Sequence, residues 1–293
     1  MSIPQYPHFS ALALEQRAVF EKSLRQSPPV ISEHTFTNLF AWRDAYHLRV
    51  SLLDGLFVLR AQLDTGEAFF PLIGTGNRIR TMQRLLDETG RRFVRVPEAE
   101  ALEAASLEGI AAVEDRDNAD YLYLREQLAG LSGRRYDGKR NLIRKFKSGT
   151  AYDYLALDAS NVGQCLPFQQ AWCVLKDCDK DAGLQKEQSA LFSMIEHFAG
   201  FGLSGAAVVI GGRVQAFAIA EELNPETIVL HMLKAEPGIP GLYQTMLNEF
   251  IRRVPGRFTY VNMEQDLGIE GLRKAKKSYY PVRMINKYTV ERA

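Results

Sequence analysis

A cluster of positive charge lies near the middle of the chain, where residues 134–149 read RRYDGKRNLIRKFKSG. This segment carries seven Arg or Lys residues, whereas the formal net charge of the whole 293-residue chain is only +1. If the segment is helical, cations at its N-terminal end oppose the helix dipole and are unfavourable unless an anion binds there. Arginine forks and free helix amides both suit phosphate. The sequence therefore predicts an anion site formed by Arg134, Arg135, Lys139 and Arg140; the alternative is a solvated linker whose charges pair with acidic residues.

Two carboxylates, Glu264 and Asp266, accompany the end of a strand expected at residues 257–264. The carboxyl ends of strands are where sites usually open in α/β proteins. A carboxylate whose pKa is raised by burial can take the proton of an attacking amine or hydroxyl. Glu264 and Asp266 are therefore candidate general bases. The alternative is structural, with Asp266 capping the following helix and Glu264 pairing with Arg273 or Lys276.

A second strand–loop–helix junction carries Lys234 and Tyr243. Lys234 comes late on an otherwise apolar strand expected at residues 227–235, and it could face a phosphate or carboxylate in a cleft. Tyr243 opens the helix expected at residues 242–254 and could point at the polar head of a ligand. The sequence contains no Ser-His-Asp arrangement, Walker loop or metal-binding motif, so we expect no metal site.

The elements that must position these residues recur in the same order in both halves of the chain. Each half reads as helix, helix, hairpin, strand, glycine-bearing loop, helix and strand, although the two halves share few identical residues. This order predicts an α/β (α+β) fold with two similar units, each a central mixed sheet flanked by helices. The expected boundaries are residues 1–117, a basic bridging segment at 118–149, and residues 150–293.

The helices and strands themselves follow from apolar periodicity and from turn residues. In the first unit we expect helices at 11–26, 32–47 and 78–90, and strands at 50–61 (a hairpin), 67–74 and 91–98. The bridge is expected to be helical or partly helical over 118–131. In the second unit we expect helices at 162–176, 184–202, 242–254 and 269–280, and strands at 152–158, 204–223 (a hairpin), 227–235, 257–264 and 282–290.

Composition limits the class of protein. A hydrophobic content of 46% and a charged content of 24% favour well-packed cores over disorder, and the near-neutral charge gives no sign of general DNA or membrane adhesion. No apolar run approaches the ~18 residues of a membrane span, and no signal-peptide pattern opens the sequence. Cys165, Cys173 and Cys178 lack the spacing of a disulfide framework, and their apolar surroundings predict core thiols. We therefore expect a cytoplasmic protein with no integral membrane segment and no DNA partner; the oligomeric state is left open.

Three stretches, at residues 117–146, 229–250 and 260–281, resemble one protein family. It is the soluble lysyltransferase-like (DUF2156-type) family, related to the catalytic region of the phosphatidylglycerol lysyltransferases and to the Fem-type aminoacyltransferases. The resemblance implies tandem GNAT-like acyltransferase units. It rests on a Lys-Arg-Asn core at 139–141 and on a late signature. The signature consists of Asn262, Glu264, Asp266, Gly268, Arg273, Lys276 and Tyr279.

The resemblance also implies a reaction, in which an amine or hydroxyl attacks an activated carbonyl. The implied donor is an aminoacyl-tRNA or an acyl-CoA, with no tightly bound cofactor, so the partner is tRNA or a phosphate-bearing small molecule. It adds Asn141, Asn262, Arg273 and Lys276 to the residues expected to bind substrate or anion. The alternative function is a non-catalytic GNAT-like module that binds a nucleotide, a tRNA end or a phospholipid head group.

One departure from the family pattern concerns the donor. GNAT proteins that use acetyl-CoA usually carry a loop of the form Gln/Arg-x-x-Gly-x-Gly/Ala, whose amides hold the pyrophosphate. Residues 238–243 here read GIPGLY, and Pro240 removes one amide donor. Tyr243 stands where the resemblance leads us to expect a small residue. The loop therefore argues against ordinary acetyl-CoA use by the second unit.

Overall fold

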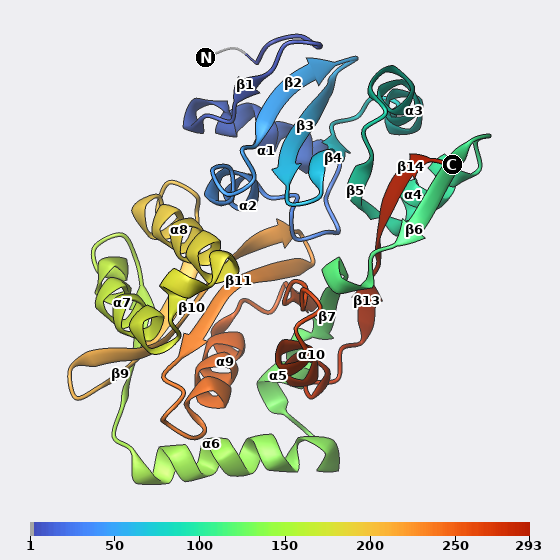
Figure 1. Cartoon of the computed structure of the whole chain (residues 1–293). Coiled ribbons are helices and arrows are strands. Elements are labelled where there is room, and N and C mark those ends of the chain that lie inside the picture. Colours follow the sequence, from blue (N-terminus) through green and yellow to red (C-terminus); the bar gives the residue numbers. More distant parts are fainter. Residues whose placement is uncertain (1–2) are drawn as a thin grey trace. The chain divides into compact units, whose positions relative to one another are not determined.

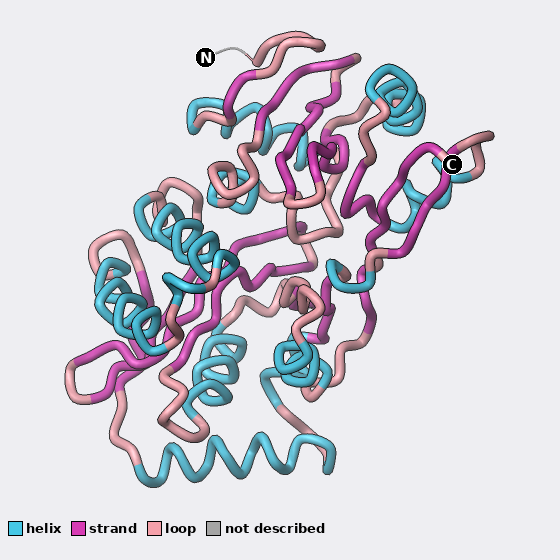
Figure 2. Tube along the Cα trace, in the orientation of Figure 1, coloured by secondary structure: helices cyan, strands magenta, loops and turns pink. Residues whose placement is uncertain are grey.

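The computed structural model describes residues 3–293 and contains two seven-stranded sheets (Figures 1 and 2). Its contacts divide the chain into two compact units. Unit 1 is Met1–Tyr121, Glu264–Lys274 and Arg283–Ala293, and unit 2 is Leu122–Met263 and Ala275–Val282. The prediction of two α/β units, each with a mixed sheet flanked by helices, is confirmed. The expected boundaries gave each unit one continuous segment, whereas the observed units each combine segments that are distant in the sequence.

The sheet of unit 1 has the strand order β1-β2-β3-β4-β5-β14-β6. Only the β4–β5 pair among its recorded pairings is parallel, and the other neighbours are antiparallel. The predicted hairpin at 50–61 is present, with Asp54 and Gly55 at positive φ in its turn. The strands are β1 Ser10–Ala11, β2 Arg49–Leu53, β3 Leu56–Leu63, β4 Gly66–Ile73, β5 Phe93–Pro97, β6 Ile110–Glu114 and β14 Lys287–Arg292.

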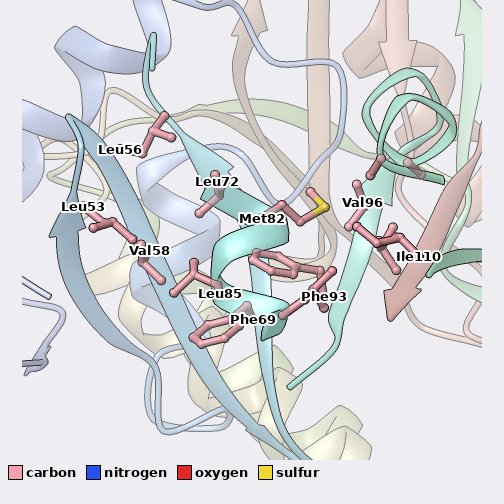
Figure 3. Close-up of a cluster of buried hydrophobic side chains, with 14 residues drawn as sticks. Leu53, Leu56, Val58, Phe69, Leu72, Met82, Leu85, Phe93, Val96 and Ile110 are labelled. Carbon is pink, nitrogen blue, oxygen red and sulfur yellow. The ribbon is translucent and has the colours of Figure 1, made fainter. Parts of the chain in front are cut away.

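Four helices belong wholly to unit 1: α1 Arg17–Gln26, α2 Phe36–Ala41, α3 Arg78–Thr89 and α4 Glu98–Ala105. Helix α3 begins where the Asn77 side chain accepts a hydrogen bond from the Arg80 amide, and it ends at Gly90 with φ 64°. Its buried face packs on the sheet through Met82 and Leu85, which meet Phe69 and Phe93 in the core drawn in Figure 3. Helix α4 and strand β6 were not predicted, because residues 98–114 lack a clear apolar period.

A buried polar cluster fastens strand β14 inside unit 1. The Lys287 ammonium is fully buried and lies 2.6 Å from carboxylate oxygens of both Glu33 and Asp120. Burial alone would lower the pKa of Lys287, but the two carboxylates outweigh burial and raise that pKa. Ser32 completes the cluster, because its amide and its hydroxyl both donate to Asp120.

His34 is buried in unit 1 as well, and its surroundings keep it neutral. Burial lowers the pKa of the imidazole to about 3, and the nearby positive charge of Arg78 lowers the pKa further. The ring bonds the backbone of Pro71, while Nε2 has no hydrogen-bond partner within residues 3–293. Between about pH 6.5 and pH 3, the unfolded chain therefore binds a proton on His34 that the folded unit 1 does not bind.

The second sheet, most of whose strands belong to unit 2, has the strand order β13-β7-β12-β11-β10-β9-β8. Strands β11 and β12 run parallel, and the β7–β12, β8–β9, β9–β10 and β10–β11 pairs are antiparallel. The β10–β11 register shifts between the Ile219–Met232 and Ala220–Leu230 pairs, which leaves His231 as an extra residue in a bulge. The strands are β7 Asp120–Leu124, β8 Asp153–Leu157, β9 Ser204–Ile210, β10 Arg213–Asn224, β11 Thr227–Ala235, β12 Tyr260–Asn262 and β13 Arg283–Ile285.

The helices of the second half of the chain are α5 Arg125–Gly130, α6 Asp137–Gly149, α7 Cys165–Leu175, α8 Ala182–Glu196, α9 Leu242–Arg253 and α10 Glu270–Lys277. Helix α9 contacts the central strands β10 and β11, and helix α7 contacts β10. Helix α6 runs as a long, nearly straight rod along one edge of unit 2 (Figure 1). It is attached to the unit through α9, on which it packs with Ile143 and Phe146 buried.

Two sequence expectations are wrong, and a third is confirmed only in part. Residues 118–131 are partly helical as expected, through α5, but residues 120–124 form strand β7, since alternating Tyr and Leu suit a strand that pairs with β12. The single strand expected at 282–290 is two strands, β13 and β14, which belong to different sheets. Cys173 and Cys178 are joined in a disulfide rather than being free thiols, while Cys165 is free and buried.

No helix in the described part of the chain is long and apolar enough to cross a membrane.

Candidate functional site

A cavity of about 580 Å³ opens in unit 2 at the end of strand β11 and the start of helix α9. Most of its wall comes from β11, from loop 236–241 and from the first turn of α9. Helices α6, α7 and α8 supply the rest. The lining residues are Leu142, Trp172, Lys176, Leu184, Glu187, Leu233, Lys234, Ala235, Glu236, Pro237, Ile239, Pro240, Gly241, Tyr243 and Gln244.

Lys234 is the buried cation of this cavity, with a side chain only 5% exposed. Its Nζ atom lies 2.6 Å from Oε2 of Glu187 and 3.7 Å from the centre of the Trp172 ring. Burial lowers the pKa of Lys234, and the Glu187 carboxylate counteracts that effect. A cation held between a carboxylate and an indole face is well ordered, so Lys234 and Glu187 form a fixed ion pair in the cavity wall.

The first turn of α9 presents backbone amides to the cavity. Gly241 precedes the helix in a left-handed conformation, φ 86°, and no side chain caps the helix. Thr245 N–H bonds the Gly241 carbonyl and Leu242 N–H bonds the Ile239 carbonyl, whereas the amides of Tyr243 and Gln244 fall among the first four of the helix, which have no partner inside it. Two amides and the helix dipole can therefore hold one anionic group at this end of the cavity.

Helix α6 comes very close to the same turn. A Cβ atom added to Gly241 would overlap the carbonyl group of Leu142, and it would touch Phe146 as well. Only glycine fits this crossing, because both the φ angle and the space exclude a side chain. The Leu142 carbonyl oxygen carries partial negative charge. It therefore repels and crowds a second phosphate beside the N-terminus of α9.

Tyr243 lines the cavity, and Tyr279 is its neighbour. Burial raises the pKa of Tyr243 to about 12, and burial together with neighbouring Tyr243 raises the pKa of Tyr279. The Tyr279 hydroxyl is buried and has no hydrogen-bond partner among the residues that the structure describes. Both phenols stay protonated at neutral pH, so each can act as a hydrogen-bond donor.

The basic segment is helical from Asp137, and its cations have different surroundings. Arg140 donates to the carbonyls of Leu131 and Gly133 and to Asp137, so it closes the end of α5. Lys139 donates to Ser278 at 2.6 Å and lies 4.2 Å from the Tyr279 ring centre. These two predicted anion ligands are engaged within the protein.

Arg134 and Arg135 are exposed on the 3₁₀ turn before α6. Arg135 lies over the rings of Tyr136 and Tyr280 and donates to Gln127. Asn141, also predicted as a ligand, accepts a hydrogen bond from Arg144. Leu142, unlike the buried Ile143 and Phe146 of the same helix, is 37% exposed and lines the cavity.

Asp266 belongs to unit 1 and is fully bonded there. Its carboxylate accepts hydrogen bonds from Arg273, from the Tyr121 hydroxyl at 2.5 Å and from the Gly268 amide. Burial would raise the pKa of Asp266, but these hydrogen bonds and the charge of Arg116 outweigh burial and hold that pKa well below its usual range. A carboxylate held this way is a weak base, which speaks against the proton-transfer role expected for it.

The other residues of the late signature are spread over both units. Glu264, in unit 1, has a left-handed backbone (φ 55°), and its carboxylate accepts from Asn38 at 3.4 Å. Asn262 is a buried residue of β12 in unit 2. Lys276, also in unit 2, donates to the Met263 carbonyl at 2.6 Å. Of the predicted ligands, only Lys234 and Tyr243 line the cavity.

Sequence reasoning did not identify Trp172, Lys176 or Glu187. They lie on helices α7 and α8 or at their ends, whose sequences read as ordinary packing helices. One signal was available: a lysine in an apolar strand needs an anionic partner, which makes an acidic residue near Lys234 an expectation. No group of three or more His, Cys, Asp or Glu that could hold a metal ion occurs in residues 3–293.

Comparison with protein families supplies a further observation. Residues 24–291 match the family described as phosphatidylglycerol lysyltransferase, C-terminal. A search of curated proteins gave no match. The family match extends over both units, so it concerns the tandem arrangement as well as the cavity-bearing unit.

Three solved structures are similar to this one. A conserved protein of unknown function from Bacteroides thetaiotaomicron is 31% identical, with a TM-score of 0.89 over 97% of this chain and 99% of that chain. L-PGS from Bacillus licheniformis is 13% identical, with a TM-score of 0.65 over 100% of this chain and 94% of that chain. FemX is 9% identical, with a TM-score of 0.57 over 98% of this chain and 97% of that chain. The last two similarities concern the fold, which is that of tandem GNAT-like proteins.

Proposed function

This chain belongs to the phosphatidylglycerol lysyltransferase C-terminal family, and from that premise we propose that it transfers an aminoacyl group from an aminoacyl-tRNA to an amine or hydroxyl acceptor. Family and fold both relate it to acyl and aminoacyl transferases. The donor's aminoacylated end enters the cavity of unit 2. The family description makes lysyl-tRNA the first donor to test and a phosphatidylglycerol hydroxyl the first acceptor.

The observation that carries this proposal is the buried Lys234 ammonium at the wall of the cavity. It lies in the same cavity as the first turn of α9, whose Tyr243 and Gln244 amides have no partner inside the helix. An ammonium and two amides suit one phosphate, and the apolar residues of the lining suit a flat base and a ribose. These groups match the terminal nucleotide of a tRNA.

The same cavity is poorly suited to coenzyme A. A pyrophosphate needs a longer run of amides than this loop offers, since Pro240 has no N–H. The Leu142 carbonyl also lies against Gly241, near the position that a second phosphate would take. A donor with a single phosphate near its reactive ester avoids both difficulties.

The chemistry required is ester aminolysis or transesterification. The acceptor nitrogen or oxygen attacks the ester carbonyl carbon, the bond from that carbon to the ribose oxygen breaks, and the ribose hydroxyl takes a proton. Glu187 is paired with Lys234 at 2.6 Å and takes no part in proton transfer, so the acceptor's proton passes to the ribose oxygen as the ester bond breaks. Lys234 fixes the donor phosphate and Tyr243 donates a hydrogen bond, so positioning supplies most of the rate enhancement.

The test is transfer of a labelled amino acid from charged tRNA to phosphatidylglycerol vesicles, to soluble amines and to peptides. We expect Lys234→Met to weaken donor binding by about 10- to 100-fold, the loss of one charge-assisted hydrogen bond. Lys180→Met is the matched control, because that side chain is 78% exposed and does not line the cavity. Transfer from acyl-CoA, with none from any charged tRNA, would disprove the proposed donor.

The alternative is a module that binds a phosphate-bearing ligand without transferring anything. The observation that favours it is the closed Lys234–Glu187 pair, which leaves neither group in an activated state. Under this alternative, tRNA ends or nucleotides bind the cavity with a dependence on Lys234, while no donor and acceptor pair gives product. The transfer assay and the binding assay together decide between the two.

A further inference from the structure

We propose that the exposed side of helix α6 is a docking surface for the phosphate backbone of RNA, outside the cavity and continuous with it. The basic face is defined here as Arg134, Arg135, Arg144 and Lys145. This inference rests on the proposed function, because it extends the path of the same donor beyond the cavity. It concerns residues to which the transfer chemistry gives no role.

Charge is unevenly paired along this segment. Within the described residues no carboxylate forms an ion pair with Arg134, Arg144 or Lys145, and the one acidic residue of the segment, Asp137, pairs with Arg140. Elsewhere in the chain many arginines have acidic partners, as Arg78 has Glu100 and Arg84 has Glu88. Unpaired cations are therefore concentrated on one exposed helix of a nearly neutral protein.

The length of helix α6 and the direction of its cations both suit a nucleic-acid strand. Its 13 residues extend about 20 Å, a length that accompanies about six stacked nucleotides of one strand. Arg144 lies opposite the buried Ile143 and Phe146, and Lys145 is exposed beside it, so both cations face solvent. Lys147 is excluded from the face because it pairs with Glu249 of α9. Figure 1 shows α6 lying along the outside of unit 2, with no other helix of that unit covering its outer side.

The basic face begins beside the cavity. Leu142 lines the cavity, and Lys145, three residues later, lies on the same side of the helix. A polynucleotide whose end is seated beside Lys234 thus leaves the cavity past Leu142 and meets Lys145 and Arg144. At the other end of the helix, Arg135 lies over the half-exposed Tyr280 ring, which adds an aromatic surface suited to a base.

An anionic membrane surface is the other macromolecule that a basic helix attracts, and the structure favours it less. Membrane-binding helices also insert an apolar face. The apolar face of α6 is already used, since Ile143 and Phe146 are buried and Leu142 lines the cavity. The remaining exposed side of α6 is mainly charged and polar, which suits a phosphate backbone.

The experiment measures binding of fluorescently labelled, deacylated tRNA across a salt series by anisotropy. Deacylated RNA is the probe, so the result does not depend on transfer. We expect Arg144→Glu with Lys145→Glu to weaken binding at least tenfold at low salt and to reduce the slope of log K against log salt by about 1.4 to 1.8. The control, Lys22→Glu with Arg80→Glu, changes net charge equally at exposed positions of unit 1 and should bind within about twofold of the unaltered protein.

Two outcomes would overturn the inference. One is tRNA binding by the α6 variant with unchanged affinity and salt slope. The other is failure of the unaltered protein to bind tRNA while it binds phosphatidylglycerol vesicles through α6. Unchanged thermal unfolding of the α6 variant shows that a loss of binding is not a loss of folding. Failure of transfer with tRNA binding intact would instead count against the proposed function alone.

Discussion

Replacing Gly241 with alanine tests whether the crossing of α6 and α9 shapes the cavity. The change adds one methyl group where φ is 86° and where the Leu142 carbonyl already occupies the space. A backbone carbonyl cannot rotate away as a side chain does, so α6 must shift. Leu142 lines the cavity and moves with it.

The expected magnitude has two parts. A left-handed conformation costs a residue with a Cβ atom roughly 1–2 kcal/mol, and forcing a methyl group into filled space costs about 1–3 kcal/mol more. Gly211→Ala is the matched control, because its φ is 56° and nothing lies within 4 Å of the added Cβ. Both variants share the backbone cost and the effect on the unfolded chain, so the difference between them isolates the overlap.

The assay is urea unfolding of the two variants and the unaltered protein, followed by donor binding. We expect Gly241→Ala to lower the free energy of unfolding by about 1–3 kcal/mol more than Gly211→Ala does. Donor affinity should fall for Gly241→Ala alone. Equal destabilisation by the two variants would show that α6 yields freely, and the argument that it limits the room beside α9 would then be wrong.

Three further predictions concern buried polar groups. With a folded pKa of about 3 for His34 against about 6.5 unfolded, stability is complete above pH 6.5 and falls as pH drops toward 3; the loss is about 2 kcal/mol at pH 5, and urea unfolding of His34→Asn should lack it. Lys287→Met leaves Glu33 and Asp120 buried without their cation, so it should destabilise unit 1 by about 3–5 kcal/mol near neutral pH, and a loss below 1 kcal/mol would contradict the pairing. Tyr279→Phe removes a buried hydroxyl that has no partner in residues 3–293, so thermal unfolding should be unchanged or slightly higher in temperature; a marked loss of stability would reveal a missing bond.

Much of the fold was predictable because its signals are local. Turn residues such as Asp54-Gly55 and Gly211-Gly212 indicate the hairpins. A cap and a closing glycine indicate helix α3. Strand β7 was not predictable in this way. Its partner β12 lies far along the chain, and a run of Tyr and Leu reads equally well as one face of a helix until that partner is known.

The most predictable part of the site was a residue whose charge did not fit the apolar sequence around it. Lys234 stood out as a charge in an apolar strand, and the structure places it in the cavity. Trp172 and Glu187 look ordinary on their helices, so only tertiary packing could bring them to Lys234. Arg140 and Lys139 show the converse, since the charge cluster marked them but local bonds to carbonyls and to Ser278 engage them.

Strand β14 has a consequence for the order in which the protein is made. It inserts between β5 and β6, and it is the only strand that β6 pairs with in its sheet. Residues 287–292 leave the ribosome only after the whole continuous segment 122–263 of unit 2. Until then β5 has an open edge and β6 has no neighbour, and Glu33 and Asp120 lack the ammonium of Lys287. During synthesis the sheet of unit 1 therefore stays incomplete until the end of the chain is made. Most of unit 2 is complete before that point and can fold first.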